Sequence, residues 1–151
     1  MKRLNVVYLA IAVLMLVSCS KEEGFQNDDQ GALSGIWSGT MSANNWIGHF
    51  DFRMDLDQDG KEIEETSTIS FPDKSRGEAT MILKGNLVGS TFTFEELSIL
   101  EHTGEQESFG WCIKTGLLTF DNIGGIGTLT GSWSDPSQCR NTGEMNLSKI
   151  N

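Results

Sequence analysis

The residue types that most often carry out catalysis are sparse in this chain, and they form no familiar constellation. The two histidines, His49 and His102, lie far apart, and the sequence contains no Gly-x-Ser-x-Gly, glycine-rich phosphate loop or His-x-x-x-His pattern. Nucleophilic catalysis needs a nucleophile beside a base, and the absence of a Cys-x-x-Cys spacing argues against a zinc site. We therefore predict a protein that is not an enzyme, with no catalytic residue and no cofactor.

Three aspartates at alternate positions, Asp55, Asp57 and Asp59, could supply oxygen ligands to calcium. Followed by a glycine, they resemble the first half of an EF-hand loop, Asp-x-Asp-x-Asp-Gly. The ninth and twelfth positions of that loop are Ile63 and Thr66, so the bidentate glutamate is missing. The flanking pattern is that of a strand. We predict the acidic outer face of a β-hairpin, with a calcium site as the weaker alternative.

Glu65 and Ser67 are candidate ligand-binding residues because of their position in a strand pattern. They alternate with the same parity as Ile63 and Ile69, which would direct both side chains into the interior of a sheet protein. A carboxylate in the interior is costly unless it is paired or hydrated, so it could mark a polar ligand pocket. The alternative is a β-bulge near Glu65 that turns both side chains outward, and we favour this alternative.

The four tryptophans could stack against a ligand, but aromatic side chains mainly form the core of small β-domains. Trp46 is the exception, because it follows Asn44 and Asn45 in a polar turn where a large ring would be partly exposed. We therefore name Trp46 as a further ligand-binding candidate.

The elements that would position these residues are β-strands. The clearest lies at residues 50–57, where apolar and charged side chains alternate strictly, and Asp59 with Gly60 then marks a hairpin turn. Further strands are predicted at 35–43, 63–71, 79–88, 91–95, 109–120, 125–133 and 144–150, and residues 97–101 either continue the strand at 91–95 or form another. About eight to ten short antiparallel strands favour a meander closed into a barrel, with a β-sandwich as the alternative. Closure would hide the strand edges of a solitary domain.

The start of the first strand, Gly35-Ile36-Trp37, resembles the Gly-x-Trp signature of lipocalin-like barrels. This resemblance implies that Trp37 closes one end of the barrel beneath the first strand. It also implies that Lys149, in the last strand, lies over the tryptophan ring.

The N-terminus resembles a bacterial lipoprotein signal. Lys2 and Arg3 precede an apolar run from Leu4 to Val17, which is too short for a comfortable membrane span and fits a secretory signal. The sequence Leu16-Val17-Ser18-Cys19 resembles a lipobox, which implies a signal peptide at residues 1–18 and a lipid-modified Cys19. The alternatives are an ordinary signal peptide with a chance cysteine, or an anchor that is not cleaved.

The residues after Cys19 suggest where the lipoprotein would go. Ser20 carries no inner-membrane retention signal, so the resemblance implies an outer membrane location. Lys21-Glu22-Glu23 is similar to a short charged signal for display at the cell surface. Polar residues without periodicity then predict a flexible acidic tether at 19–33, followed by the barrel domain at 34–151.

The charge of the chain restricts its partners. The formal net charge is −10, and loss of Lys2 and Arg3 with the signal peptide would bring it to −12. An acidic surface repels phosphate backbones and anionic headgroups. We therefore expect no nucleic acid partner, and contact with the membrane through the N-terminal lipid.

With Cys19 assigned to lipid, Cys112 and Cys139 remain as a pair in an exported protein, where a disulfide is the default. Two free thiols or half of a metal site are the alternatives. Alternation along the predicted strand 109–120 puts Trp111 on one face and Cys112 with Lys114 on the other. If Trp111 points inward, Cys112 points outward, where the loop at 134–142 can reach it.

Together these patterns predict a lipid-anchored cell-envelope lipoprotein. Its barrel would bind a small apolar ligand, a glycan or a partner protein. The alternative is a structural or accessory subunit of an outer-membrane complex, with a barrel filled by its own side chains.

Overall fold

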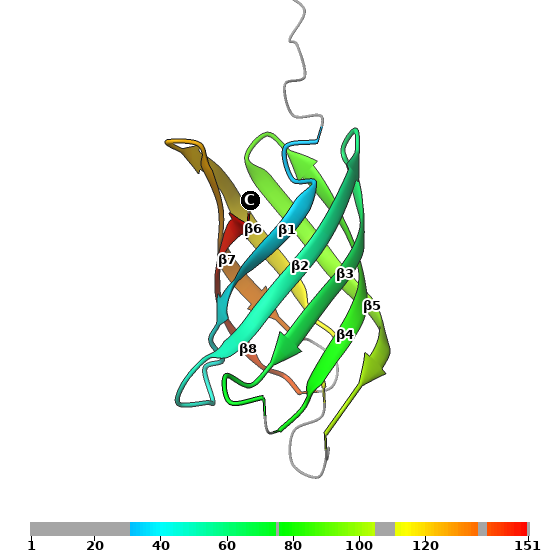
Figure 1. The fold of residues 1–151 in the computed structure, drawn as a ribbon, viewed down its shortest axis with the longest axis vertical. Helices are drawn as coiled ribbons and strands as arrows, with labels where there is room; N and C mark the ends of the chain where they lie inside the picture. The colour runs from blue at the N-terminus through cyan, green and yellow to red at the C-terminus, as the bar shows by residue number, and fades with distance from the viewer. Residues whose placement is uncertain (1–30, 75, 105–110, 136–138, 151) are drawn as a thin grey trace, which may run out of the picture.

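Eight antiparallel strands follow one another in a meander, and the last strand pairs with the first to close a barrel (Figure 1). The structure, a computed structural model, describes residues 31–74, 76–104, 111–135 and 139–150. The strands are β1 (Gly35–Met41), β2 (Phe50–Asp59), β3 (Glu62–Ser70), β4 (Glu78–Val88), β5 (Thr91–His102), β6 (Thr115–Ile123), β7 (Ile126–Ser134) and β8 (Thr142–Ile150). Because β1 pairs with both β2 and β8, the predicted lipocalin-like meander barrel is confirmed, and the alternative of a β-sandwich is wrong. The predicted signal peptide and Cys19 lie outside the described residues.

Strand β2 shows why the sequence folds this way. Its even-numbered residues Phe52, Met54 and Leu56 are buried in the barrel core, while Arg53 and Asp57 between them are exposed. Successive side chains of a strand point to opposite faces, so the strict alternation of the sequence becomes an apolar inside and a charged outside. The predicted hairpin turn follows at Gly60, whose φ of 63° is a conformation that glycine adopts without strain.

Strand β5 is one continuous element, which is one of the two alternatives that the sequence left open. Its register with β4 shifts twice, so that Met81 pairs with Ile99 and Thr80 with Glu101. The first shift leaves Leu100 without an opposite residue, and the second does the same for Leu97. Such bulges disrupt the ladder locally and bend the strand, and both leucines are exposed.

Strand β6 begins later than predicted. The sequence pattern indicated a strand over 109–120, but β6 starts at Thr115, and residues 111–114 lie outside the strands. The parity argument therefore fails before Thr115. Trp111 is buried as expected, but Lys114, which we predicted to point outward, is buried as well.

One end of the barrel, which we call the closed end, is formed by the three hairpin turns β2–β3, β4–β5 and β6–β7 and by the chain entering β1 (Figure 1). Leu33, which the sequence suggested belonged to the tether, is fully buried here, and its carbonyl accepts a 2.8 Å hydrogen bond from Trp37 Nε1. Lys149 Nζ lies 5.6 Å from the centroid of the Trp37 ring and donates to the carbonyl of Ala32. The arrangement implied by the Gly-x-Trp resemblance is present.

The opposite end, which we call the mouth, is formed by the four other connections: β1–β2, β3–β4, β5–β6 and β7–β8 (Figure 1). These connections are longer than the hairpin turns of the closed end. Loops that are placed by a rigid scaffold are where binding residues concentrate, so the mouth is the place to look for a site.

Candidate functional site at the barrel mouth

A cavity of about 240 Å³ opens inside the mouth. Most of its lining is apolar or aromatic, with two amide side chains and one ammonium group. The described lining residues are Met41, Ala43, Asn45, Trp46, Phe50, Ile69, Phe71, Trp111, Cys112, Lys114, Trp133, Cys139 and Asn141. Concave, mainly apolar sites with a few placed polar groups are typical of small-molecule binding.

Aromatic rings build one wall of the cavity. Phe71 is central, with ring centroids 5.1 Å from Phe50, 6.0 Å from Trp46 and 6.1 Å from Trp111. These edge-on and tilted arrangements are the ones that aromatic quadrupoles favour. The guanidinium of Arg76 lies 5.0 Å from the Phe71 centroid and 5.5 Å from that of Trp46, so a cation covers the rim of this wall.

Several hydrogen bonds hold the β1–β2 connection against β7 and β8. Trp133 Nε1 donates to the carbonyl of Ser42 at 2.8 Å, and Asn44 Nδ2 donates to Thr142 Oγ1 at 2.6 Å. The first bond gives the N–H of the buried Trp133 indole the hydrogen-bond partner that a buried tryptophan usually finds. Trp46 follows two residues after Asn44, so these bonds fix the turn that presents its ring to the cavity.

A buried ion pair lies below the aromatic wall. Lys114 Nζ is 2.8 Å from Glu96 Oε2, and the two side chains are only 2% and 0% exposed. The carboxylate also accepts a bond of 2.6 Å from Ser67 Oγ and one of 2.9 Å from the Lys114 backbone N–H. Lys114 Nζ also donates to the carbonyl of Cys112. A buried charge is tolerated only with such partners.

The positions of Glu96 and Lys114 follow from local structure. Glu96 continues the inward-facing series Phe92 and Phe94 along β5, so its side chain enters the barrel. Lys114 lies just before β6, where its carbonyl accepts a 2.8 Å hydrogen bond from the Glu96 backbone N–H. One backbone hydrogen bond therefore joins the two residues, from Glu96 N–H to the Lys114 carbonyl, and the Lys114 N–H donates to the side-chain carboxylate of Glu96.

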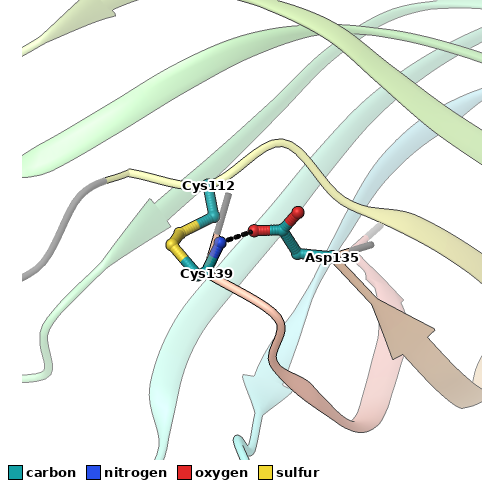
Figure 2. A group of neighbouring side chains, drawn as sticks. All are labelled: Cys112, Asp135 and Cys139. Carbon is teal, nitrogen blue, oxygen red and sulfur yellow. Dashed lines mark hydrogen bonds between the residues drawn. A yellow bond between two sulfur atoms is a disulfide. The ribbon is translucent and has the colours of Figure 1, made fainter. Parts of the chain in front are cut away.

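The predicted disulfide between Cys112 and Cys139 is present and lies at the edge of the cavity (Figure 2). Asp135 is 2% exposed, and its Oδ2 accepts a 2.7 Å hydrogen bond from the Cys139 backbone N–H. Its own N–H donates to the carbonyl of Asn141. The disulfide therefore joins the segment before β6 to the β7–β8 connection, and Asp135 fixes the second of these.

Within the described part of the chain, one group of potential metal ligands has its donor atoms within 4.8 Å of one another: Cys112, Asp135 and Cys139. Both sulfur atoms belong to the disulfide, and a metal requires thiolates. These three residues therefore join two segments of the mouth through a disulfide and a hydrogen bond.

The structure separates the candidate residues Glu65 and Ser67, which we expected to share one orientation. Ser67 is fully buried and bonds to Glu96, whereas Glu65 is exposed. In the strand ladder Glu65 pairs with the inward-facing Leu56 and Leu83, but its φ of 148° interrupts the regular strand. The β-bulge that we favoured is absent, because the register with β2 and β4 is continuous through Glu65. Glu65 is exposed as that alternative expected, but Ser67 points inward, so the expectation was wrong for Ser67.

The remaining predictions have different outcomes. Trp46 is partly buried and lines the cavity, as its partly polar surroundings indicated. Asp55, Asp57 and Asp59 lie along β2, but Asp55 pairs with Arg53 at 3.3 Å, and the described carboxylates of this strand do not converge as a ligand group. The β2–β3 hairpin with its acidic outer face accounts for them.

The sequence reasoning missed Glu96 and Lys114, although signals for both exist. Glu96 is an acidic residue in the inward parity of β5, and Lys114 is a cation within an otherwise apolar stretch. Each is unexpected alone, and together they indicate a buried pair. Lys114 was misplaced because residues 111–114 lie outside the strands, where alternation does not apply, and without Lys114 the inward position of Glu96 had no partner to explain it.

The described residues include no helix that is long and apolar enough to cross a bilayer. Comparison with known protein families, curated proteins and solved structures finds no match to the chain. Function is therefore inferred from the geometry of the mouth.

Proposed function

We propose that this domain is a non-enzymatic binding module that holds a small ligand with an apolar or sugar ring in the mouth cavity. The observation that carries the proposal is the cavity itself, with the aromatic wall around Phe71 on one side and the ammonium group of Lys114 among its lining residues. Aromatic faces stack on flat rings and on the apolar faces of sugars, and a few polar groups then fix orientation.

The size of the cavity limits the ligand. A volume of about 240 Å³ corresponds to roughly eight water molecules at ~30 Å³ each. That volume lies below the ~300–1,000 Å³ that is usual for drug-sized ligands. The proposed ligand is therefore a single-ring compound or one terminal sugar of a glycan, with any remainder extending out of the mouth.

The polar lining residues suggest how such a ring would be oriented. The amides of Asn45 and Asn141 can each donate and accept hydrogen bonds. Among the described lining residues Lys114 is the charged one, and its charge is balanced by Glu96. This environment suits hydroxyl or carbonyl groups on the ligand better than a second full charge.

The cellular setting is part of the same proposal: attachment to the outer membrane through a lipid on Cys19, with the domain possessing no catalytic activity. The N-terminal sequence supports the anchor, and the Cys112–Cys139 disulfide is in keeping with an oxidising compartment outside the cytoplasm. Without a catalytic constellation, the mouth has the features of a binding site.

A second candidate is an accessory subunit of an outer-membrane complex. It is favoured by one observation: below Lys114 the barrel is filled by its own side chains, among them the fully buried Met54, Met81, Leu118 and Leu129. In that case the mouth would contact a protein segment, and single-ring compounds would not bind.

Ligand-observed saturation-transfer NMR on the purified chain tests the proposal with named probes, indole and N-acetylglucosamine. We expect saturation transfer to at least one probe, because a single ring fits the aromatic wall. Trp46→Ala should reduce the transfer strongly. Ile47→Ala is the matched control, because the neighbouring side chain is fully exposed and is absent from the cavity lining. No transfer to either probe, or equal transfer in both variants, would favour the accessory subunit.

A further inference from the structure

Four isoleucines form a row on the outer wall at the closed end. Ile36 of β1 pairs with Ile150 of β8, and Ile123 of β6 pairs with Ile126 of β7. Thr128 pairs with Ser148 in the β7–β8 ladder, and two further steps along both antiparallel strands bring Ile126 opposite Ile150. The register therefore places the four side chains in neighbouring positions across four strands, and we call them the isoleucine row.

The isoleucine row faces outward. Trp37 and Lys149, the sequence neighbours of Ile36 and Ile150, turn toward the barrel interior and the closed end, so alternation directs the isoleucines away from it. The exposed fractions rise along the row, from partly exposed Ile36 through 50% and 57% to 72% for Ile123. Contiguous exposed apolar side chains mark an interaction surface more often than scattered ones do.

Three of the other exposed apolar residues, Ile47, Leu97 and Leu100, have a different setting. Ile47 is isolated at the mouth, and Leu97 and Leu100 are exposed because each lies at a register shift of β5. The isoleucine row has no such local explanation, because β6 and β7 pair without a register shift up to Ile123 and Ile126, and β1 and β8 do so up to Ile36 and Ile150. It includes the β6–β7 hairpin, which extends at the same end of the barrel as the entering chain (Figure 1).

We infer that the isoleucine row rests on the surface of a lipid bilayer. The inference depends on the proposed lipid at Cys19. Thirteen residues separate Cys19 from Leu33, and a chain of that length with the properties predicted for the tether has an end-to-end distance of about 20 Å. Leu33 is fixed under Trp37 at the closed end, so the anchor holds this end, and not the mouth, next to the bilayer.

The charge of the molecule restricts the kind of bilayer. The chain has a formal net charge of −10, and Asp55 lies beside Ile36 in the β1–β2 ladder. Anionic headgroups would repel this surface, so the contact is apolar and suits a zwitterionic leaflet. With the closed end on the bilayer, the mouth points away from the membrane and is open to a ligand in solution.

Photo-crosslinking of the full chain tests the orientation. The photoreactive residue p-benzoylphenylalanine replaces Ile123 in one variant and Ile126 in a second. A third variant carries it in place of Ile47, which is equally apolar and fully exposed but lies at the mouth. Each variant is reconstituted on phosphatidylcholine vesicles and irradiated, and lipid adducts are measured by mass spectrometry.

We expect the yield of lipid adducts to be several-fold higher at positions 123 and 126 than at position 47. A membrane-attached chain with equal yields at both ends would overturn the inference and leave the anchor and the ligand site intact. A crosslink between two copies of the chain at position 123 would also overturn it, in favour of a dimer. A chain that does not co-sediment with vesicles would defeat the anchor, and the inference with it.

Discussion

At each end of the barrel a lysine lies beside an aromatic ring, but the two lysines have different partners and different exposure. At the closed end, Lys149 Nζ lies 5.6 Å from the Trp37 centroid, and at the mouth Lys114 Nζ lies 5.8 Å from the Phe52 centroid. Lys149 is partly exposed and binds a backbone carbonyl, whereas Lys114 is buried and binds the carboxylate of Glu96. A cation that reaches water needs only a weak partner, but a buried one needs a countercharge.

The ends also differ in what covers the barrel. The segment before β1 covers the closed end, where Leu33 is fully buried against Trp37. At the mouth, the corresponding indole of Trp133 bonds to the β1–β2 connection, and the cavity remains open beside it. One end of the same barrel is therefore filled, while the other keeps room for a ligand.

The sharpest contrast in stability concerns the two lysines. We expect Lys114→Met to lower the free energy of unfolding by about 3–5 kcal/mol, because it leaves Glu96 buried without a countercharge. The matched change at the closed end, Lys149→Met, should cost about 1 kcal/mol or less, the usual value of a solvent-accessible cation–π contact. Urea unfolding of the two variants measures both values.

A double variant separates the charge effect from a loss of packing. Glu96→Leu with Lys114→Met should recover most of the lost stability, because apolar residues of similar volume can replace a buried pair. If the double variant is as unstable as Lys114→Met alone, the ion pair is not the reason for the loss. If Lys114→Met and Lys149→Met lower the free energy of unfolding equally, the proposed difference between the buried and the exposed lysine is wrong.

A loss in the lower part of the range given for Lys114→Met is expected from removing the disulfide, which among the described residues lies at the mouth alone. The disulfide closes a loop with a sequence separation of 27, so Cys112→Ser with Cys139→Ser should lower stability by about 3.5 kcal/mol on the chain-entropy account. Hydrogen exchange should also become faster at Asp135 and Cys139 but remain unchanged at Trp37. An unchanged unfolding midpoint would show that the loop is already ordered without the disulfide.

The sequence predicts side-chain orientation well where apolar and polar residues alternate regularly, and poorly where they do not. Strand β2 and its hairpin could be predicted because alternation in Phe52, Met54 and Leu56 is a local property. The orientation of Lys114 could not, because it is set by bonds to Glu96, which is eighteen residues away in sequence. Glu65 lies between these cases: its outward orientation was predicted, but it results from a positive φ and not from a β-bulge, and Ser67 was wrongly expected to turn outward with it.

The cavity was beyond sequence reasoning for a related reason. It is formed where four connections meet, and the positions of Trp46, Phe71 and Trp111 relative to one another depend on barrel closure. Composition predicts that such rings belong to the core. Which of them line a cavity depends on the register of strands that are distant in sequence. The disulfide was easier, since two cysteines allow one pairing once Cys19 is set aside.

The central claim is that the mouth, and not the closed end, binds a ligand, and the indole N–H signals of the tryptophans test it directly. In a ¹H–¹⁵N correlation spectrum, Trp46, Trp111 and Trp133 report on the cavity, and Trp37 reports on the closed end. Titration with indole or N-acetylglucosamine should shift the mouth signals in a saturable manner and leave the Trp37 signal in place. A titration that shifts none of them, or that shifts Trp37 as much as the mouth tryptophans, would contradict this account.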